Sequence, residues 1–459
     1  MDKRNVCLMN DSFPPSIDGV ANAVTNYAKI ISGGLGKAAV VTPYYPDADD
    51  SAFPFPVLRY PSLDMTRAVG YRAGMPFDSD LLRDLKNRDF DLIHSHCPIS
   101  STILARELRD RIDAPVVLTY HTKFDIDIAN AIRGKHLREE AALLLVQNIA
   151  GCDEVWTVSR GAGENLRQLG FQGEYRVMPN GVDFPRGRVS DGLVARATEG
   201  YDLPEDLPVF LFVGRMMWYK GIRLVLDALC ALKEAGQGFR MVFIGEGGDK
   251  EEIMAYSASL GLEGLVLFAP AIRDREQIRA WYCRADLFLF PSTFDTNGLV
   301  VREAAACGLA SVLVAGSCAA EDVTDGETGF LIEENAEAMA AKLTELCRHL
   351  PELRRVGTQA QREIYVSWEE AVRRAYERYG VVIENYHRGL YPRHDRPTDT
   401  LVHGLASAMD ALSRGREVRR HAAAELHSGV DGLKAECSDE RRRVRERLED
   451  LAQRMDRFL

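Results

Sequence analysis

Two carboxylates and a helix start lie close together in the segment 287–308, LFLFPSTFDTNGLVVREAAACG. The pattern predicts an apolar strand, a short polar loop and the first turns of a helix. The free N–H groups and partial positive charge of a helix start suit a phosphate. Asp295 in the loop and Glu303 in the helix would instead accept hydrogen bonds from hydroxyls. An anion site combined with hydroxyl acceptors is what a nucleotide sugar requires.

Acids near a helix start can also serve the helix alone, by offsetting the positive end of its dipole. Two features of this segment favour a bound ligand instead. Asn297 and Gly298 precede the predicted helix, and glycine lets a ligand approach the backbone closely. Glu303 lies too deep in the predicted helix to act as its cap.

A basic pair follows another apolar run, PVFLFVG. Arg215 and Lys220 lie in the segment VGRMMWYKG. A forked guanidinium and a compact ammonium can bind a diphosphate and stabilise it as a leaving group, although ordinary surface charge is the alternative. A glycine-rich turn, GEGG at 245–248, is either a phosphate loop or, more simply, a tight turn from strand to helix. It matches neither G-x-G-x-x-G nor the P-loop pattern.

Three histidines end candidate strands in the first half of the chain. His94 and His96 lie in IHSHCP, and His121 follows a tyrosine in TYHT. We expect His94 and His96 to be hydrogen-bonded structural residues. His121 is either a partner for a substrate hydroxyl or a buried structural residue. No further ligand spacing supports a metal site, and FDID at 124–127 is too short a pattern to indicate one.

The loop DSFPPSIDGVANAV at 11–24 leads into another predicted helix. Gly19 lies just before that helix, where the backbone could approach a phosphate closely. A simple flexible turn is the alternative for this glycine.

Short apolar runs alternate with amphipathic stretches along the chain. The first set comprises NVCLMN, AAVVTP, FDLIHSH, PVVLTYH and DEVWTVS, and the second PVFLFVG, FRMVFIG, LVLFA, DLFLFP and ASVLVA. This alternation predicts an α/β protein with parallel sheets covered on both faces. GYDLPEDLP at 200–208 is typical of a linker, so we predict two doubly wound, Rossmann-like domains at 1–200 and 201–365. Ligands of such sheets bind at the carboxyl ends of the strands, which places the site in the cleft between the domains.

The composition limits the class of protein. A length of 459 residues predicts two or three domains, and a net charge of −11 argues against non-specific binding to nucleic acid. The nine cysteines form no Cys-x-x-Cys pair, which fits a reducing cytosol. No apolar run reaches about 18 residues, so no membrane span is expected. NVCLMN near the N-terminus predicts a strand rather than a signal peptide, and we expect a cytoplasmic protein.

The last part of the chain differs from the rest. SWEEAVRRAYERYGVVIENYH predicts a crossover helix at 366–390 that packs back across the domains. The tail at 391–459 begins with PRHDRP and then has a charged, helical pattern. A solvated or partly disordered helix, a self-association helix and a membrane-surface helix are the alternatives for this tail.

Taken in order, these segments resemble family 4 of the retaining glycosyltransferases (glycosyl transferases group 1), which have the GT-B fold. The resemblance covers roughly residues 4–385. It rests on DSFPPSIDGVANAV, IHSHCP, TYHT, TVSRG, MPNGVD, VGRMMWYKG, IGEGG and FDTNGLVVREAAACG. The family pattern at the acidic motif is Glu, seven residues, Glu. Here Asp295 replaces the first Glu, and Asn297 replaces the usual Phe before Gly298.

The resemblance implies a donor site for a nucleotide-diphosphate sugar. Glu303 would hold the ribose hydroxyls and Asp295 the hydroxyls of the transferred sugar, while Arg215 and Lys220 would bind the diphosphate. Backbone groups would complete the site: those of Gly19, Gly298, Leu299 and Val300 near the diphosphate and that of Ile272 near the base.

The resemblance also implies a mechanism. His121 would touch the sugar near its anomeric centre, and Asp18 and Asn22 would line the acceptor side. The leaving diphosphate and the incoming hydroxyl would share one face of the sugar, so that the anomeric configuration is retained. Positioning and charge stabilisation would provide most of the catalysis, and domain closure would exclude water. We expect no metal or other cofactor, because Arg215, Lys220 and the helix start supply the positive charge.

The sequence says less about the acceptor substrate than about the donor. Basic residues lie beside apolar ones in the segment 121–146, namely Lys123, Arg133, Lys135 and Arg138. In lipid-modifying relatives such a face lies on anionic membrane; an ordinary amphipathic helix is the alternative. A lipid or lipid-linked acceptor, with peripheral attachment to the inner face of the membrane, remains an option.

Three other functions are alternatives to a glycosyltransferase. A catalytically silent GT-B protein that binds a nucleotide sugar would usually have lost Arg215, Lys220 or Glu303, and all three are present. A dinucleotide-dependent oxidoreductase would need G-x-G-x-x-G after the first strand, and NVCLMNDSFPPSIDGV has none. A phosphorylase would need a cofactor lysine or a pocket for inorganic phosphate, neither of which the sequence indicates.

Overall fold

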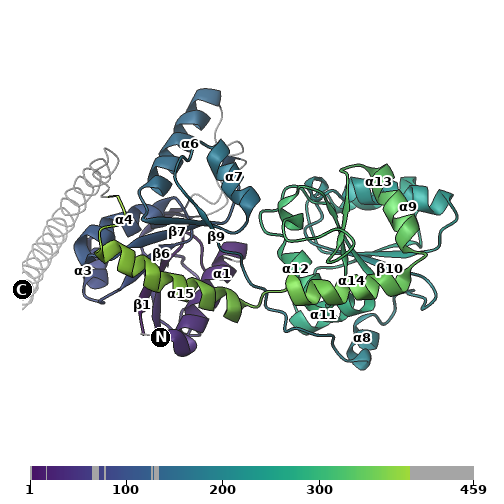
Figure 1. Ribbon diagram of the computed structural model, residues 1–459, viewed down its shortest axis with the longest axis horizontal. Coiled ribbons are helices and arrows are strands. Elements are labelled where there is room, and N and C mark those ends of the chain that lie inside the picture. The colour runs from purple at the N-terminus through teal and green to yellow at the C-terminus, as the bar shows by residue number, and fades with distance from the viewer. Residues whose placement is uncertain are drawn as a thin grey trace, which may run out of the picture.

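The computed structural model describes residues 3–16, 18–64, 72–76, 79–125, 128 and 134–392. These residues form two α/β domains that lie beside one another (Figure 1). Each domain is built on a sheet whose paired strands are parallel, with helices packed around it. The predicted α/β class with two Rossmann-like domains is therefore confirmed.

The N-terminal domain carries a sheet with the strand order β3-β2-β1-β6-β7-β8-β9. Its strands are β1 (Asn5–Met9), β2 (Lys37–Pro43), β3 (Val57–Tyr60), β6 (Leu92–Ser95), β7 (Val116–Tyr120), β8 (Glu154–Thr157) and β9 (Arg176–Val177). Its helices are α1 (Gly19–Ile30), α3 (Ser79–Lys86), α4 (Ser100–Ile112), α6 (Lys135–Ala150) and α7 (Arg160–Gln168), with one further turn, η1 (Ile31–Leu35). A short antiparallel pair consists of β4 (Ser62–Asp64) and β5 (Arg72–Gly74).

The C-terminal domain carries a sheet with the strand order β12-β11-β10-β13-β14-β15. Its strands are β10 (Val209–Val213), β11 (Arg240–Ile244), β12 (Val266–Ala269), β13 (Leu287–Phe290), β14 (Ser311–Val314) and β15 (Phe330–Ile332). Its helices are α8 (Asp191–Ala197), α9 (Ile222–Glu234), α10 (Lys250–Ser259), α11 (Arg275–Arg284), α12 (Leu299–Ala306), α13 (Ala336–Leu346) and α14 (Leu350–Glu363), with the short turns η2 (Trp218–Lys220) and η3 (Cys318–Ala320).

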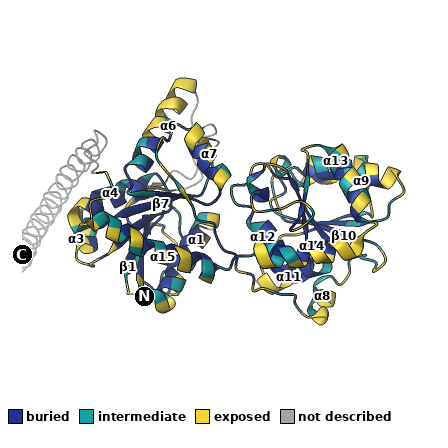
Figure 2. Cartoon of the chain, in the orientation of Figure 1, coloured by how far each residue is buried: buried dark blue, intermediate teal, exposed yellow. Residues whose placement is uncertain are grey.

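The central strands are apolar on both faces because helices cover both sides of each sheet. In β13, LFLF, all of the residues are buried, and β1 is buried from its second residue onward. Figure 2 shows the same distribution, with dark blue strands inside each domain and yellow residues on the outer helices. The continuous apolar runs in the sequence therefore correspond to the interior of the two sheets.

The strand order reverses direction at one place in each sheet. In the N-terminal sheet the reversal lies between β1 and β6, and in the C-terminal sheet between β10 and β13. The loops that follow such strands diverge to opposite faces and leave room for a ligand at the carboxyl ends. The predicted site segments follow β1, β10 and β13, so the topology gathers them at these reversal points.

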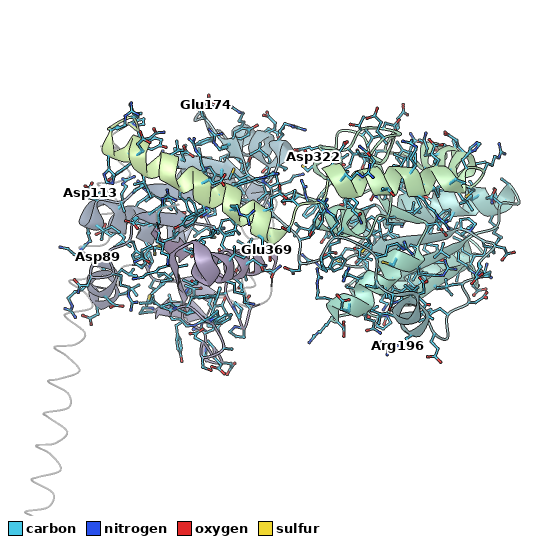
Figure 3. All side chains as sticks on the ribbon, turned by 60° about the horizontal axis from the view of Figure 1, so that its bottom comes forward. Asp89, Asp113, Glu174, Arg196, Asp322 and Glu369 are labelled. Carbon is cyan, nitrogen blue, oxygen red and sulfur yellow. The ribbon has the colours of Figure 1, made fainter. Side chains whose placement is uncertain are left out.

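The chain returns to the N-terminal domain at its end. Helix α14 packs on the C-terminal domain, while α15 (Trp368–His387) lies across the N-terminal domain (Figure 1). Trp368, Val372 and Tyr379 of α15 are buried in the N-terminal core. In Figure 3, Glu369 at the start of α15 and Asp322 of the C-terminal domain both lie near the junction of the domains. A helix thus occupies most of the predicted range 366–390, but its apolar face packs on the N-terminal domain rather than across both domains.

The start of the C-terminal domain differs from the predicted boundary at residue 200. Phe184 is buried in the C-terminal core, and Val189 and Val194 pack against the same core. Helix α8 packs on α11. The C-terminal domain therefore includes residues from about 184 onward, because these apolar side chains cover α11 before the acidic segment 200–208 begins.

The predicted tail at 391–459 lies almost wholly outside the described residues, which end at Pro392. Arg133 also lies outside them, as do residues 126 and 127 of FDID. The roles suggested for the tail, including self-association, stay predictions.

Tyr379 provides a test of how α15 is held. Its ring stacks on Trp156 with a centroid separation of 5.6 Å, and its hydroxyl is hydrogen-bonded to His94 Nδ1 at 2.6 Å. Tyr379→Phe should lower the free energy of unfolding by roughly 1–3 kcal/mol, because a buried ring nitrogen loses its partner. Urea unfolding measures the change. Val381→Ala, at an exposed position on the same helix, is the control and should change the free energy of unfolding by less than about 0.5 kcal/mol. Equal effects of the two substitutions would contradict the role of Tyr379 in holding α15.

Candidate active site

The loop after β10 carries the predicted basic pair. Arg215 has an exposed side chain, and its guanidinium forms no hydrogen bond or ion pair with a described residue. Lys220 lies in η2 and is largely buried, with 12% of its side chain exposed. Gly221 then has a φ of 78°, and a Cβ there would lie 2.8 Å from the carbonyl oxygen of Pro291. Glycine is required at this point, because it lets the β10 loop pack against the loop that follows β13.

Lys220 and Asp295 are in direct contact across these two loops. Lys220 Nζ donates to Asp295 Oδ1 at 2.6 Å, and Ser292 Oγ donates to Asp295 Oδ2 at 2.6 Å. The structure therefore brings together the residue predicted to hold the diphosphate and the residue predicted to hold the sugar. A carboxylate bound on both oxygens is fixed in orientation, and its remaining lone pairs can accept from sugar hydroxyls.

Helix α12 begins at an open end. Gly298 precedes it with φ 56° and ψ 45°, and no side chain caps the first turn. A Cβ on Gly298 would lie 2.9 Å from Ala319 Cα, so this position also requires glycine. The first turn, which includes Leu299 and Val300, contains no acidic residue. The start of α12 thus combines free amides with uncompensated positive charge, which is a general anion site.

Glu303 lies one turn further along α12 and is held on both carboxylate oxygens. Arg275 donates to Oε1 at 2.7 Å, and the Tyr282 hydroxyl donates to Oε2 at 3.1 Å. Burial raises the pKa of Glu303, and the charge of Arg275 opposes that rise. Arg275 also lies 4.4 Å above the ring of Phe184 and 3.8 Å from a carboxylate oxygen of Asp183.

Sequence reasoning missed Arg275, Tyr282 and Ser292. Arg275 is one of several charges in the segment IRDREQ, and Tyr282 has the pattern of an apolar core position. Only the packing of α11 on α12 shows that both contact Glu303.

In the N-terminal domain, His121 follows the end of β7 and is buried. Its Nε2 lies 3.0 Å from His96 Nδ1, and the two rings stack at 5.2 Å. Burial lowers the pKa of His121 to about 3, so the imidazole is neutral at physiological pH. His94 is hydrogen-bonded to Thr119 and to the Tyr379 hydroxyl. The structural role expected for His94 thus has a direct basis, and His96 supports His121.

Two hydrogen bonds join the β7 and β13 loops across the domains. Thr296 Oγ1 donates to the backbone oxygen of His121 at 2.8 Å, and Lys123 Nζ donates to the backbone oxygen of Thr293 at 3.3 Å. These contacts place His121 next to the loop that carries Asp295.

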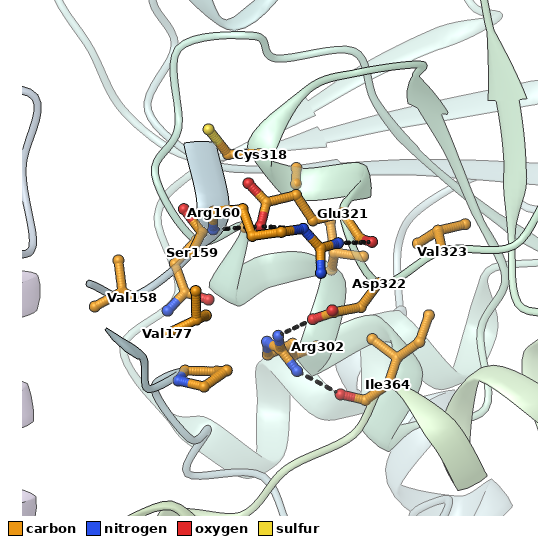
Figure 4. Close-up of a pocket in the computed structure, with 15 residues that line it drawn as sticks. Val158, Ser159, Arg160, Val177, Arg302, Cys318, Glu321, Asp322, Val323 and Ile364 are labelled. Carbon is orange, nitrogen blue, oxygen red and sulfur yellow. Dashed lines mark hydrogen bonds and ion pairs between the residues drawn. The ribbon is translucent and has the colours of Figure 1, made fainter. Parts of the chain in front are cut away.

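A second set of contacts joins the domains beside α12. Glu321 accepts hydrogen bonds from the backbone N–H groups of Arg160, at 2.6 Å, and Gly161, at the start of α7. In Figure 4 the Arg160 side chain points toward Glu321, and Arg302 lies between Asp322 and Ile364. The cavity shown there is lined by residues of both domains, including Gly298. The start of α12 is thus part of the domain interface.

The predicted residues at the start of α1 make local contacts. Asp18 caps α1 by accepting from the amides of Val20 and Ala21 at 2.9 and 2.8 Å, and a Cβ added to Gly19 would meet no atom within 4 Å. Asn22 accepts a hydrogen bond from Asn26. In the described residues, no contact joins these α1 residues to Lys220, Asp295 or Glu303, so their roles stay predictions.

Ile272 and the GEGG turn support the C-terminal domain. Ile272 is half-buried and packs against the C-terminal core. A Cβ on Gly245 would lie 1.9 Å from the carbonyl oxygen of Gly214, and a Cβ on Gly247 would lie 2.2 Å from that of Met216. The backbone of the GEGG turn therefore packs closely against the backbone of the Arg215 loop. This agrees with the simpler prediction, a tight turn from strand to helix.

Comparison with known proteins identifies the family. The model of "Glycosyl transferases group 1" matches residues 196–363, and that of "Glycosyltransferase Family 4" matches residues 17–186. The two segments correspond to the two domains. The chain belongs to the group 1 glycosyltransferase family.

Relatives of known name agree with this assignment. A D-inositol 3-phosphate glycosyltransferase of Streptomyces avermitilis is 28% identical over 323 residues, which is 66% of this chain and 68% of the relative. One from Segniliparus rotundus is 30% identical over 298 residues, which is 61% of this chain and 64% of the relative. The chain is a glycosyltransferase.

Solved structures show the GT-B fold. Anabaena HepE in complex with UDP and glucose has a TM-score of 0.64 at 17% identity, covering 82% of this chain and 99% of that one. Sucrose-phosphate synthase of Thermosynechococcus elongatus has a TM-score of 0.65 at 20% identity, covering 83% of this chain and all of that one. The GT-B fold implied by the sequence motifs is thereby confirmed.

The Arg275–Glu303 contact can be tested directly. Arg275→Ala should raise the pKa of the Glu303 carboxyl further, because it removes the positive charge that opposes the effect of burial. A ¹³C NMR titration of the Glu303 carboxyl measures this pKa. Arg273→Ala, at an exposed neighbouring position, is the control and should leave it unchanged. A Glu303 pKa that stays constant or falls in Arg275→Ala would contradict the contact.

Proposed function

We propose that this enzyme transfers a hexose from a nucleotide-diphosphate sugar to a hydroxyl acceptor with retention of the anomeric configuration. The observation that carries the proposal is the Lys220–Asp295 contact beside the open start of α12. One small region supplies a cation and helix amides for phosphate, together with a carboxylate for sugar hydroxyls. A sugar diphosphate, which carries phosphate anions and free hydroxyls, uses both kinds of group at once.

The donor is proposed to lie along α12. Its diphosphate would be bound by Arg215, Lys220 and the amides of Leu299 and Val300. The sugar hydroxyls would meet Asp295, and the ribose hydroxyls would meet Glu303, one helical turn from the phosphates. Solved GT-B neighbours were crystallised with UDP and with UDP-glucose, which supports a nucleotide sugar here. We consider UDP-glucose-like and GDP-mannose-like donors.

The proposed reaction exchanges one bond at the anomeric carbon for another. The bond from this carbon to the diphosphate oxygen breaks, and a bond to the acceptor oxygen forms on the same face. The acceptor proton passes to the departing phosphate oxygen. Arg215 and Lys220 stabilise the negative charge on the leaving group. His121 is uncharged, so it can lie near the cationic transition state without repelling it.

The positive charge is proposed to come from the protein rather than from a metal ion. An open helix start and two basic side chains provide what a divalent cation supplies in other transferases.

The acceptor is proposed to be a hydroxyl compound, and a membrane lipid remains one option. The curated relatives are named D-inositol 3-phosphate glycosyltransferases, which supports a ring hydroxyl as nucleophile. Leu137, Leu143 and Leu144 of α6 are more than half exposed, and α6 projects from the N-terminal domain in Figure 2. Lys135 of the same helix is ion-paired with Glu139, so the exposed leucines rather than net positive charge support contact with a membrane surface. None of the helices in the described residues combines the length and apolar character needed to span a bilayer.

A catalytically silent protein that only binds a nucleotide sugar is the alternative. It would share the donor site and lack turnover, so binding and transfer must be measured separately.

A thermal-shift panel of UDP- and GDP-sugars tests donor binding. A true donor raises the melting temperature because it binds only the folded state. Glu303→Ala should abolish the shift or raise the required ligand concentration by roughly 10- to 100-fold, as expected for loss of hydrogen bonds to a charged group. Glu327→Ala, at an exposed position outside the site, should behave as wild type. Stabilisation of Glu303→Ala equal to that of wild type would remove Glu303 from the site.

Lys220→Ala tests the transfer step. It should lower kcat by roughly 10²- to 10³-fold, because the charge that develops on the diphosphate loses its nearest cation. Turnover of the donor is followed by NMR, which also shows whether the anomeric configuration is retained. The exposed Lys29→Ala is the control. EDTA is present throughout; loss of wild-type activity in EDTA, or full activity of Lys220→Ala, would contradict the proposed source of charge.

A further inference from the structure

Two aromatic side chains form an exposed pair beside the Lys220–Asp295 contact. Tyr219 is 39% exposed and Phe294 is 37% exposed, and their ring centroids lie 4.5 Å apart at an interplanar angle of 43°. Among the described residues, Tyr44 is the one other exposed large aromatic side chain. Because the two rings are in contact, their exposed faces form one small apolar surface next to the charged pair.

The pair belongs to the loops that carry the proposed donor contacts. Tyr219 directly precedes Lys220, and Phe294 directly precedes Asp295. Lys220 Nζ lies 5.5 Å from the centroid of the Tyr219 ring while it donates to Asp295 at 2.6 Å. The Tyr219–Phe294 pair is therefore continuous with the groups proposed to hold the diphosphate and the transferred sugar.

The two parts of this region differ in exposure. Lys220 and Asp295 are half-buried, whereas Tyr219 and Phe294 are exposed, so the charged pair forms the inner part. Tyr219 and Phe294 form the outer part, which faces solvent. Because the proposed donor contacts occupy the inner part, the outer part is left for the acceptor.

Polar groups lie next to Phe294, at one edge of the aromatic pair. Thr293, next to Phe294, donates through Oγ1 to Glu334 at 3.2 Å. Lys123 of the N-terminal domain reaches the backbone oxygen of Thr293 at 3.3 Å. An apolar centre with donors and acceptors at its edge matches a ring that has a C–H face and hydroxyls on its rim. A plain alkyl chain would cover these polar groups without offering them hydrogen bonds.

We propose that Tyr219 and Phe294 form the platform on which a hydroxylated ring of the acceptor, a sugar or cyclitol, stacks during transfer. The inference rests on the proposed function, because it needs a donor sugar beside Asp295. The aromatic faces bind the C–H face of the ring and leave its hydroxyls free to reach the anomeric carbon and the polar edge.

A single probe distinguishes a ring from an alkyl chain. Octyl β-D-glucopyranoside, used below its micelle concentration with UDP present, carries a hydroxylated ring and a chain in one molecule. Saturation-transfer NMR reports which of its protons contact the protein. We expect the strongest transfer to the C–H protons of the ring. Transfer to the octyl chain alone would overturn the proposal and assign the platform to an alkyl group.

Variants connect the signal to the two residues. Tyr219→Leu and Phe294→Leu should each weaken binding of the probe by about 2- to 10-fold, because an aromatic face is lost while apolar character remains. Tyr219→Phe should keep the signal. Tyr44→Ala removes an exposed ring outside this region and is the matched control. A signal that both leucine variants retain in full would overturn the proposal.

Calorimetric binding of UDP to the same samples separates this inference from the proposed function. The leucine variants should bind UDP as wild type does. If wild type binds UDP and the ring signal does not depend on Tyr219 or Phe294, only the platform fails. If wild type does not bind UDP, both the proposed function and the platform fail.

Discussion

A sugar diphosphate is strongly negative at one end and rich in hydroxyls at the other, so its site must place cations and carboxylates close together. In the proposed site of this enzyme, the contact between Lys220 and Asp295 would meet that requirement, because each charge holds the other in place beside the start of α12. The contact depends on two backbone features. Gly221 lets the Lys220 loop pack on Pro291, and Gly298 lets α12 begin against Ala319. A side chain at Gly221 would push the Lys220 loop away from Pro291, and one at Gly298 would displace the start of α12 from Ala319.

The same region links the two domains. Thr296 binds the backbone of His121, and Glu321 binds the first amides of α7, so the segments on both sides of α12 contact the N-terminal domain. A ligand that orders the start of α12 therefore acts at the domain interface as well. Helix α15 contributes from the other side, because Tyr379 stacks on Trp156 and binds His94, which in turn lies against His96. Contacts between residues that are distant in sequence thus fix the neutral histidines and the charged loops relative to one another.

The sequence predicted those features that depend on local pattern. Apolar runs indicated the strands, and the acids, glycines and basic residues after them indicated the site, because parallel sheets gather such loops at one edge. Features that depend on packing between distant segments were not predicted. Arg275 and Tyr282 bind Glu303 only because α11 packs on α12. The boundary at residue 200 followed from an acidic, proline-containing segment, whereas the burial of Phe184 depends on a core that the sequence does not display.

The central claim is that the start of α12 and Lys220 together bind a diphosphate. The most direct test is a crystal structure of the enzyme in complex with UDP. The account predicts that the diphosphate oxygens lie within hydrogen-bonding distance of Lys220 Nζ and of the amides of Leu299 and Val300, with the ribose hydroxyls at Glu303. A UDP molecule bound with its phosphates away from α12, and with the Lys220–Asp295 contact undisturbed, would contradict it.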